Sequence, residues 1–273
     1  MYPVPTSLSP SRVESFLSCP MAFRFASIEK LPEPPSVHTT RGSLVHRALE
    51  ILFMLEPGAR SHDAAFSSLD SAIHEYRSDP DFTDLGLTLD QAEVFWGEAR
   101  DLVRGYLAME DPQTIREIGL EIRLEAAVGD LTLRGIIDRL ELDDAGELIV
   151  TDYKTGRAPG PKYVQSAFNG VHFYSFLCQA VFGRRPAKIR LMYLKTGEII
   201  EATTSEQSVR AITTRTTAVW KALEKACVTG DFRPKTGPFC GNCSFKAWCP
   251  AFGGDPALAA AEAPRALATV SPA

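Results

Sequence analysis

The hydrophobic pattern of the chain changes its period near residue 118, and this change most limits what the chain can fold into. Before it, apolar residues recur at helical spacing, whereas after it they alternate with polar residues, as is typical of β-strands. Gly-Asp and Asp-Asp-Ala-Gly turns divide the alternating part into three strands. We therefore expect an antiparallel meander over 118–127, 131–142 and 147–153.

Helical patterns flank these strands. Ser9 and Pro10 are typical of the start of a short helix. We expect further helices over 41–55, 62–77, 89–109, 161–182 and 205–228, and strands over 189–194 and 199–203. The sequence thus predicts an α/β fold with a mixed central sheet flanked by helices. We expect one domain over 1–252, with a helical insertion at about 50–112, a cysteine segment at about 230–252 and a flexible tail over 253–273.

The composition is ordinary for a globular protein, with 45% hydrophobic and 23% charged residues. No apolar stretch has the length of a membrane span, and the N-terminus lacks a secretory signal, so we expect a cytoplasmic protein without a membrane partner. Residues 1–150 contain 13 Lys and Arg against 26 Asp and Glu, whereas 151–273 contain 16 against 8. The basic second part would attract a phosphate backbone, although basic residues often only cover solvated helix faces.

Two acidic residues and a lysine fall near the ends of adjacent predicted strands. Asp152 and Lys154 share one face of a strand because they are two residues apart, and Asp138 can meet them across the hairpin. Two partly buried carboxylates repel each other unless a cation neutralises them, and such oxygen ligands suit Mg²⁺ or Mn²⁺. That metal can polarise a phosphate and activate water, while the lysine stabilises the developing charge. The alternative is an exposed Asp-Lys ion pair worth about 0–1 kcal/mol.

An ordered set of motifs extends this pattern along the chain. It consists of G-x-x-x-H ending at His46, then Asp138, then D-Y-K-T-G starting at Asp152. The set resembles the PD-(D/E)xK nuclease superfamily and is most similar to the RecB-family exonucleases. The resemblance implies a restriction-endonuclease-like sheet with His46, Asp138, Asp152 and the backbone carbonyl of Tyr153 as ligands of the catalytic metal. It also implies that Lys154 assists the attacking water.

The family usually continues with Q-x-x-x-Y on the following helix, which positions the lysine and the DNA. Tyr174 fits the tyrosine, but Gly170 stands where the glutamine is expected, and Gln165 is out of register. The resemblance therefore implies a nucleic-acid-binding role for Tyr174 within a degraded motif, and a core position is the alternative. Arg157 and Lys162 follow the lysine motif and are predicted to contact phosphates.

Four of the six cysteines have the spacing of ligands. Three form C-x2-C-x5-C near the C-terminus, one precedes a proline near the N-terminus, and four thiolates can hold either zinc or an iron-sulfur cluster. The arrangement is similar to the iron-staple nucleases, namely the AddB nuclease domain and the CRISPR-associated RecB-like exonucleases. That resemblance implies a structural 4Fe-4S cluster that joins the two ends of the chain, held by Cys19, Cys240, Cys243 and Cys249.

Three functions follow from these features. The first is a metal-dependent DNA exonuclease, also able to act as a flap or single-strand endonuclease, in DNA repair and recombination or in CRISPR spacer processing. The chain lacks a G-x-x-x-x-G-K-[ST] motor motif, so processive action would need a helicase or CRISPR adaptation proteins as partners, and the DNA would be single-stranded or have single-stranded ends. The second is a DNA-binding or assembly module of the same fold with lost or secondary nuclease chemistry. The third is a zinc-binding regulator.

Overall fold

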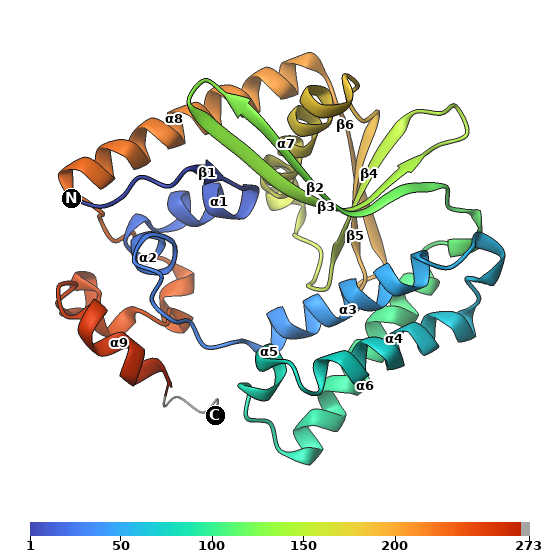
Figure 1. The fold of residues 1–273 in the computed structure, drawn as a ribbon, viewed down its shortest axis with the longest axis horizontal. Coiled ribbons are helices and arrows are strands. Elements are labelled where there is room, and N and C mark those ends of the chain that lie inside the picture. Colours follow the sequence, from blue (N-terminus) through green and yellow to red (C-terminus); the bar gives the residue numbers. More distant parts are fainter. Residues whose placement is uncertain (269–273) are drawn as a thin grey trace.

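The computed structural model describes residues 1–268, apart from the side chains of residues 163, 165–167, 169–171 and 268. Within this part of the chain, one mixed six-stranded sheet is flanked by helices (Figure 1). Its strands are β1 (Ser7–Leu8), β2 (Glu117–Val128), β3 (Leu131–Leu142), β4 (Leu148–Lys154), β5 (Lys188–Tyr193) and β6 (Glu198–Thr203). The α-helices are α1 (Pro10–Ser18), α2 (Pro20–Phe23), α3 (Val37–Phe53), α4 (His62–Tyr76), α5 (Pro80–Thr83), α6 (Leu89–Leu107), α7 (Val164–Phe182), α8 (Glu206–Thr229) and α9 (Ala259–Ala268). Short 3-10 or π-helical turns connect them at Arg24–Ile28, Pro57–Ala59, Pro112–Thr114, Pro161–Tyr163, Pro238–Asn242, Lys246–Trp248 and Pro250–Phe252.

The predicted meander is confirmed in β2, β3 and β4, which pair antiparallel in chain order. A two-residue turn joins β2 to β3, and Gly129 in this turn has a φ of 60°, a left-handed conformation that such turns require. Beyond β4, the helix α7 crosses over to β5, which pairs parallel with β4, and β6 returns antiparallel to β5. The sheet is therefore mixed, as the sequence predicted.

One edge of β3 is shared by two strands. At its start, β3 pairs in parallel with the short strand β1 through Thr132 and Leu133. At its end, β3 pairs with β4 from Arg139 to Leu142. Between Leu133 and Arg139, the structure pairs no described strand with this edge, so a gap opens in the sheet beside the middle of β3.

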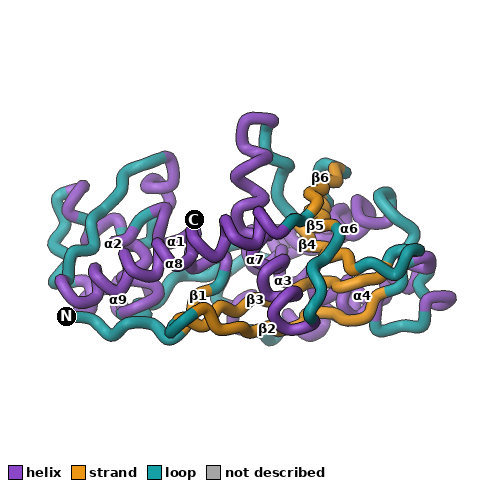
Figure 2. The backbone as a smooth tube through the Cα atoms, turned by 90° about the horizontal axis from the view of Figure 1, so that it is seen from above, coloured by secondary structure: helices purple, strands orange, loops and turns teal. Residues whose placement is uncertain are grey.

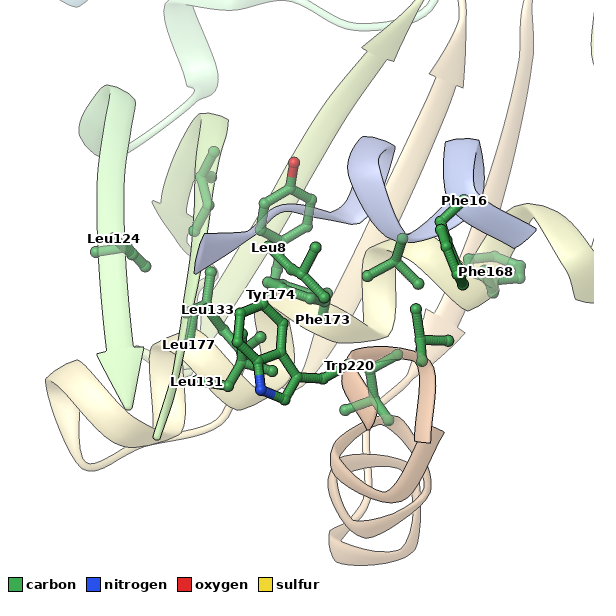
Figure 3. Close-up of a cluster of buried hydrophobic side chains, with 14 of the residues drawn as sticks. Leu8, Phe16, Leu124, Leu131, Leu133, Phe168, Phe173, Tyr174, Leu177 and Trp220 are labelled. Atoms are coloured by element: carbon green, nitrogen blue, oxygen red, sulfur yellow. The ribbon is translucent and has the colours of Figure 1, made fainter. Parts of the chain in front are cut away.

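Two hydrophobic clusters cover the two faces of the central strands. On one face, α1, α7 and α8 pack through residues such as Phe16, Phe173 and Trp220, as Figure 3 shows. On the other face, α3, α4 and α6 pack against Tyr153 of β4 and Met192 of β5. These three helices form a separate group in Figure 1. The sheet is consequently buried on both sides where β4 and β5 run.

Helix α3 begins earlier than the sequence pattern predicted. The pattern placed its start at residue 41, but the Ser36 side chain accepts a hydrogen bond from the backbone N–H of Thr39 and caps the helix before Val37. The extra turn was missed because its residues are polar and do not follow the apolar spacing.

The two ends of the chain pack together in a third cluster. Met21 and Phe25 from the N-terminal part contact Phe245, Trp248 and α9, which lies near α2 in Figures 1 and 2. The prediction of a flexible tail from residue 253 is therefore wrong for most of that segment, and residues 269–273 lie outside the described part. Ala259 and Ala263 of α9 are fully buried, and small alanines gave no recognisable core pattern. None of the described helices is long and apolar enough to cross a membrane.

Candidate functional site

Three carboxylates form a row across neighbouring strands at the gap in the sheet. Glu121 of β2 lies opposite Asp138 of β3, because the residues on either side of both are paired in antiparallel register. Asp152 of β4 directly follows Thr151, the last residue of β4 that pairs with β3. Asp138 therefore stands between two other acidic residues, as the predicted meeting of Asp138 and Asp152 across the hairpin requires.

The main chain of Tyr153 joins the predicted site residues. The N–H of Tyr153 donates a hydrogen bond of 2.7 Å to Oδ2 of Asp138. At the gap, the Asp138 side chain thus accepts the hydrogen bond that a backbone carbonyl of β3 would otherwise accept. The Tyr153 carbonyl oxygen lies 3.1 Å from Nε2 of His46, which α3 brings to the same point. Nδ1 of His46 lies 3.5 Å from Oδ2 of Asp138. His46, Asp138 and the Tyr153 carbonyl thus converge, although 107 residues separate the histidine from Tyr153 in the sequence.

Lys154 and Asp152 form a close pair beside this group. Nζ of Lys154 lies 2.5 Å from Oδ2 of Asp152, and the lysine side chain is 42% exposed whereas that of the aspartate is 9% exposed. The lysine therefore reaches solvent while its partner is buried. Both residues point from the same face of β4, as the alternation of the strand predicted.

Glu121 is a site residue that the sequence pattern did not single out. Ligand atoms of His46, Glu121 and Asp138 all lie within 4.8 Å of one another. The backbone of Glu121 has a φ of 46°, a left-handed conformation that non-glycine residues rarely adopt. A usable signal was present, since a two-residue Gly-Asp turn fixes the hairpin register and places residue 121 opposite residue 138.

Burial and mutual repulsion alter the acidities in the site. Burial, and then the charge of Asp138, raises the pKa of Glu121 to about 7. Burial, and then the charge of Asp152, raises the pKa of Asp138 well above its usual range. Burial lowers the pKa of His46, which favours the neutral imidazole that metal ions bind. Burial opposes the charge of Lys154, but Asp152 outweighs it and raises the lysine pKa.

A buried network of charges supports Tyr153 from the other face of the sheet. Nη1 of Arg139 donates a hydrogen bond of 2.8 Å to the Tyr153 hydroxyl, and the Arg139 side chain is fully buried. The same guanidinium forms ion pairs of 2.5 Å with Glu110 and 2.5 Å with Glu141. Arg190 lies 3.4 Å from Glu110 and 3.2 Å from Glu141 and completes the network.

A groove of about 630 Å³ opens beside Asp152 and Lys154. It lies between the start of α1, the β2–β3 hairpin and α7, where Tyr174 contributes to its lining. Tyr174 is only 8% exposed and also belongs to the hydrophobic core shown in Figure 3. Tyr174 can therefore be a core residue and also face the groove.

The other predicted nucleic-acid contacts lie outside the groove lining. Arg157 and Lys162 are exposed in the segment between β4 and α7, and their contact with phosphates stays a prediction. The side chain of Gln165 and the surroundings of Gly170 lie outside the described residues.

The four predicted cysteine ligands line a single pocket near the joined ends of the chain. Lys235 donates its backbone N–H to Sγ of Cys19 at 3.5 Å, and Gly237 does so to Sγ of Cys240 at 3.3 Å. Within residues 1–268, no three of the sulfur atoms lie within 4.8 Å of one another. The pocket is lined by Cys19, Cys240, Cys243 and Cys249, together with Phe25 and Phe245.

The family of the chain follows from a comparison with known protein families. The model of the PD-(D/E)XK nuclease superfamily matches residues 7–250, and the chain belongs to this superfamily. These nucleases use divalent metals, and the group formed by His46, Glu121 and Asp138 has the donor atoms such an ion prefers.

Two individual proteins are similar to the chain. The gene 69 protein of Mycobacterium phage D29 is 26% identical over 180 residues, which cover 57% of this chain and 64% of the phage protein, slightly less than two thirds. A solved structure from Eubacterium rectale, which carries the provisional description of an exonuclease, aligns with a TM-score of 0.53 and 9% identity. That alignment covers 87% of each chain and supports the fold.

Proposed function

We propose that this protein is a divalent-metal-dependent nuclease that hydrolyses phosphodiester bonds in DNA. The observation that carries the proposal is the convergence on Tyr153. Its N–H and carbonyl hold Asp138 and His46, and the next residue along β4 is a solvent-reaching lysine beside a groove. Because the chain belongs to a nuclease superfamily, we propose hydrolysis of a phosphodiester bond as the reaction of this site.

The residues of the site have separable tasks. His46, Asp138 and the Tyr153 carbonyl offer ligands to Mg²⁺ or Mn²⁺. The bound ion would polarise the phosphate and lower the pKa of a water molecule. Lys154 carries a positive charge at the groove, where it can orient the attacking water and stabilise the charge that develops on the phosphate.

The groove favours a single strand as the substrate. Its volume of about 630 Å³ is in the range of a small-molecule pocket and matches a short stretch of one strand. We therefore propose DNA with single-stranded ends as the substrate. We further propose a role in DNA repair or in CRISPR spacer processing. The partners would be a helicase or adaptation proteins.

The test is a cleavage assay with matched lysine variants. Labelled single-stranded DNA, DNA with a flap, blunt duplex DNA and RNA of the same sequence are incubated with Mn²⁺. We expect cleavage of the first two by wild type and by Lys195→Ala, an exposed lysine outside the groove lining, but not by Lys154→Ala. Equal cleavage by Lys154→Ala would refute the site, whereas DNA binding without cleavage by wild type would favour the assembly module.

We also propose that the four pocket cysteines hold a 4Fe-4S cluster. Zinc binds sulfur at about 2.3 Å, so the sulfur atoms of a tetrahedral zinc site lie about 3.8 Å apart. The four cysteines line one pocket, and the backbone N–H groups of Lys235 and Gly237 donate to two of their sulfur atoms, a contact of the kind that tunes such clusters. Iron, sulfide and zinc analysis of anaerobically purified protein decides between the two, and zinc without iron would refute the cluster.

A further inference from the structure

The β2–β3 hairpin, drawn in green in Figure 1, forms one wall of the groove. Side chains two residues apart share one face of a strand, so Arg134 and Ile136 lie on the face of β3 that carries Asp138. Arg123 of β2 is paired with Ile136 and therefore lies on the same face of the sheet. Both arginines line the groove that opens beside Lys154. The hairpin thus adds two cations to the site.

The arginines lie at two distances from Asp138 along the hairpin. Arg123 stands opposite Ile136, which is two residues from Asp138 and hence about 7 Å away at the rise of a β-strand. Arg134 is four residues from Asp138, or about 13 Å. From Asp138 the hairpin runs toward β1, which pairs with the start of β3. A strand of DNA that places one phosphate at Lys154 can therefore pass Arg123 and then Arg134 along the groove.

Neither arginine is neutralised by a carboxylate. Among the side chains that the structure describes, Arg123 and Arg134 form no ion pair, and both are exposed. A third cation lies near them, since burial, and then the charge of Arg134, lowers the pKa of Arg12 in α1. The Arg12 side chain donates a hydrogen bond of 3.4 Å to the carbonyl of Ser7. Cations held close together without acidic partners attract an anionic ligand.

The acidic residues on the other walls of the groove compensate this charge only in part. Glu14 of α1 lies 2.9 Å from Arg215, which neutralises it. Glu125 of β2 stands directly opposite Arg134, and side chains in such a cross-strand pair are close enough to interact. Glu125 therefore weakens the attraction of Arg134 for a phosphate. One carboxylate against two arginines still leaves the hairpin wall positively charged.

We propose that the β2–β3 hairpin binds the DNA strand, and that Arg123 and Arg134 each contact one backbone phosphate beyond the phosphate at Lys154. This assignment rests on the proposed function, because the strand in the groove is taken to be the strand that is cut. Ile136 is 42% exposed beside Arg123 and offers apolar surface to a sugar or base. The assignment differs from the charge pattern of the sequence, since both arginines come from the acidic first part of the chain. Phosphate contacts carry no sequence information, so the hairpin should bind strands of any sequence.

The test is the salt dependence of binding to labelled single-stranded DNA, measured by fluorescence anisotropy on the full chain with a chelator that prevents cleavage. For a single strand, each neutralised phosphate contributes about 0.7 to the slope of log K against log salt. Arg123→Gln and Arg134→Gln should each reduce this slope by about 0.7 and weaken binding about two- to fivefold at low salt. Arg77→Gln is the matched control, because Arg77 is exposed at the end of α4 outside the groove lining, and it should keep the wild-type slope. An unchanged slope in either groove variant overturns the proposal.

Two further variants separate a phosphate contact from a structural role. Arg134→Lys keeps the positive charge and should keep the wild-type slope. Glu125→Gln removes the opposing charge and should bind the strand about two- to fivefold more tightly than wild type. The proposal is wrong if Arg134→Lys has the slope of Arg134→Gln, or if Glu125→Gln binds no more tightly than wild type.

Cleavage assays distinguish this proposal from the proposed function. Arg134→Gln should raise KM for single-stranded DNA more than it lowers kcat, because Arg134 lies about 13 Å from Asp138 along β3. If wild type binds the strand through both arginines but cuts no nucleic acid, the proposed function fails and the hairpin assignment stands. If wild type cuts the strand and both groove variants keep its salt slope, the hairpin assignment fails and the proposed function stands.

Discussion

Replacement of Arg139 by methionine should destabilise the protein strongly, because this side chain is the centre of the buried charge network. Arg139 is 0% exposed, and its partners Glu110 and Glu141 are 8% and 5% exposed. Removal of one partner from a buried ion pair costs about 3–5 kcal/mol, since the remaining charge is left buried. In Arg139→Met, both glutamates would keep Arg190 as their cationic partner. For a domain of this size the loss corresponds to a fall in Tm of about 6–20 °C.

The loss should depend on pH in a defined direction. Burial opposes the charge of Glu110, but Arg139 outweighs it and lowers the Glu110 pKa in the wild type. A lowered pKa stabilises the fold above the ordinary glutamate pKa, and this contribution disappears only as the pH falls through the lowered value. Without Arg139, burial dominates and raises the pKa. The variant then carries a cost at pH 7 that protonation removes at lower pH, so the difference from wild type should shrink between pH 7 and pH 5.

The assay is urea unfolding in the presence of a chelator, followed by tryptophan fluorescence, with the same occupancy of the cysteine pocket in every variant. Arg100→Met is the control, because Arg100 pairs with Asp70 at 2.7 Å but their side chains are 42% and 61% exposed. An exposed pair contributes about 0–1 kcal/mol. A loss below about 1 kcal/mol in Arg139→Met, or an equal loss at pH 7 and pH 5, would refute the reasoning.

Three further predictions concern the site and its surroundings. The Mn²⁺ affinity should rise between pH 6 and pH 8, because burial raises the pKa of the Glu121 carboxyl to about 7 and the carboxyl must lose its proton to bind a cation. Calorimetry at both pH values measures this affinity, and a constant affinity would contradict the prediction. Gly135→Val should destabilise the fold by about 1–3 kcal/mol in urea unfolding, since a Cβ at residue 135 would lie 3.0 Å from Tyr174 and leave no room for two methyl groups; an unchanged midpoint would argue against this packing. Cys243→Ser should lose iron on anaerobic purification whereas Cys178→Ser, a buried thiol outside the pocket, should keep it, and iron retained by both would count against the cluster.

The sheet and most of the site were predictable because they depend on local patterns. Alternation identified β3 and β4, and the spacing of Asp152 and Lys154 placed both on one face. The position of His46 on a helix also followed from local spacing. Its approach to the Tyr153 carbonyl does not, because that contact depends on how α3 packs against the sheet.

Glu121 and α9 were missed for different physical reasons. Glu121 lies between apolar residues on a strand whose pattern predicts one face exposed to solvent, so its side chain was not expected in a site. Its left-handed backbone conformation has no local sequence signature. Helix α9 is short and rich in alanine, and its burial depends on contacts with residues more than 200 positions away, such as Met21 and Phe25. The position of Glu121 opposite Asp138 could have been predicted from the hairpin register, whereas the burial of α9 depends on tertiary packing.

The left-handed conformation of Glu121 implies a conflict between the stability of the fold and the binding of a cation at this position. A non-glycine residue there costs about 1–2 kcal/mol, which glycine would avoid. Laboratory selection for heat resistance alone would therefore favour Glu121→Gly. The more heat-resistant variants should bind the cation more weakly than wild type. A selection that demands both properties should retain the glutamate and collect its stabilising changes elsewhere in the chain.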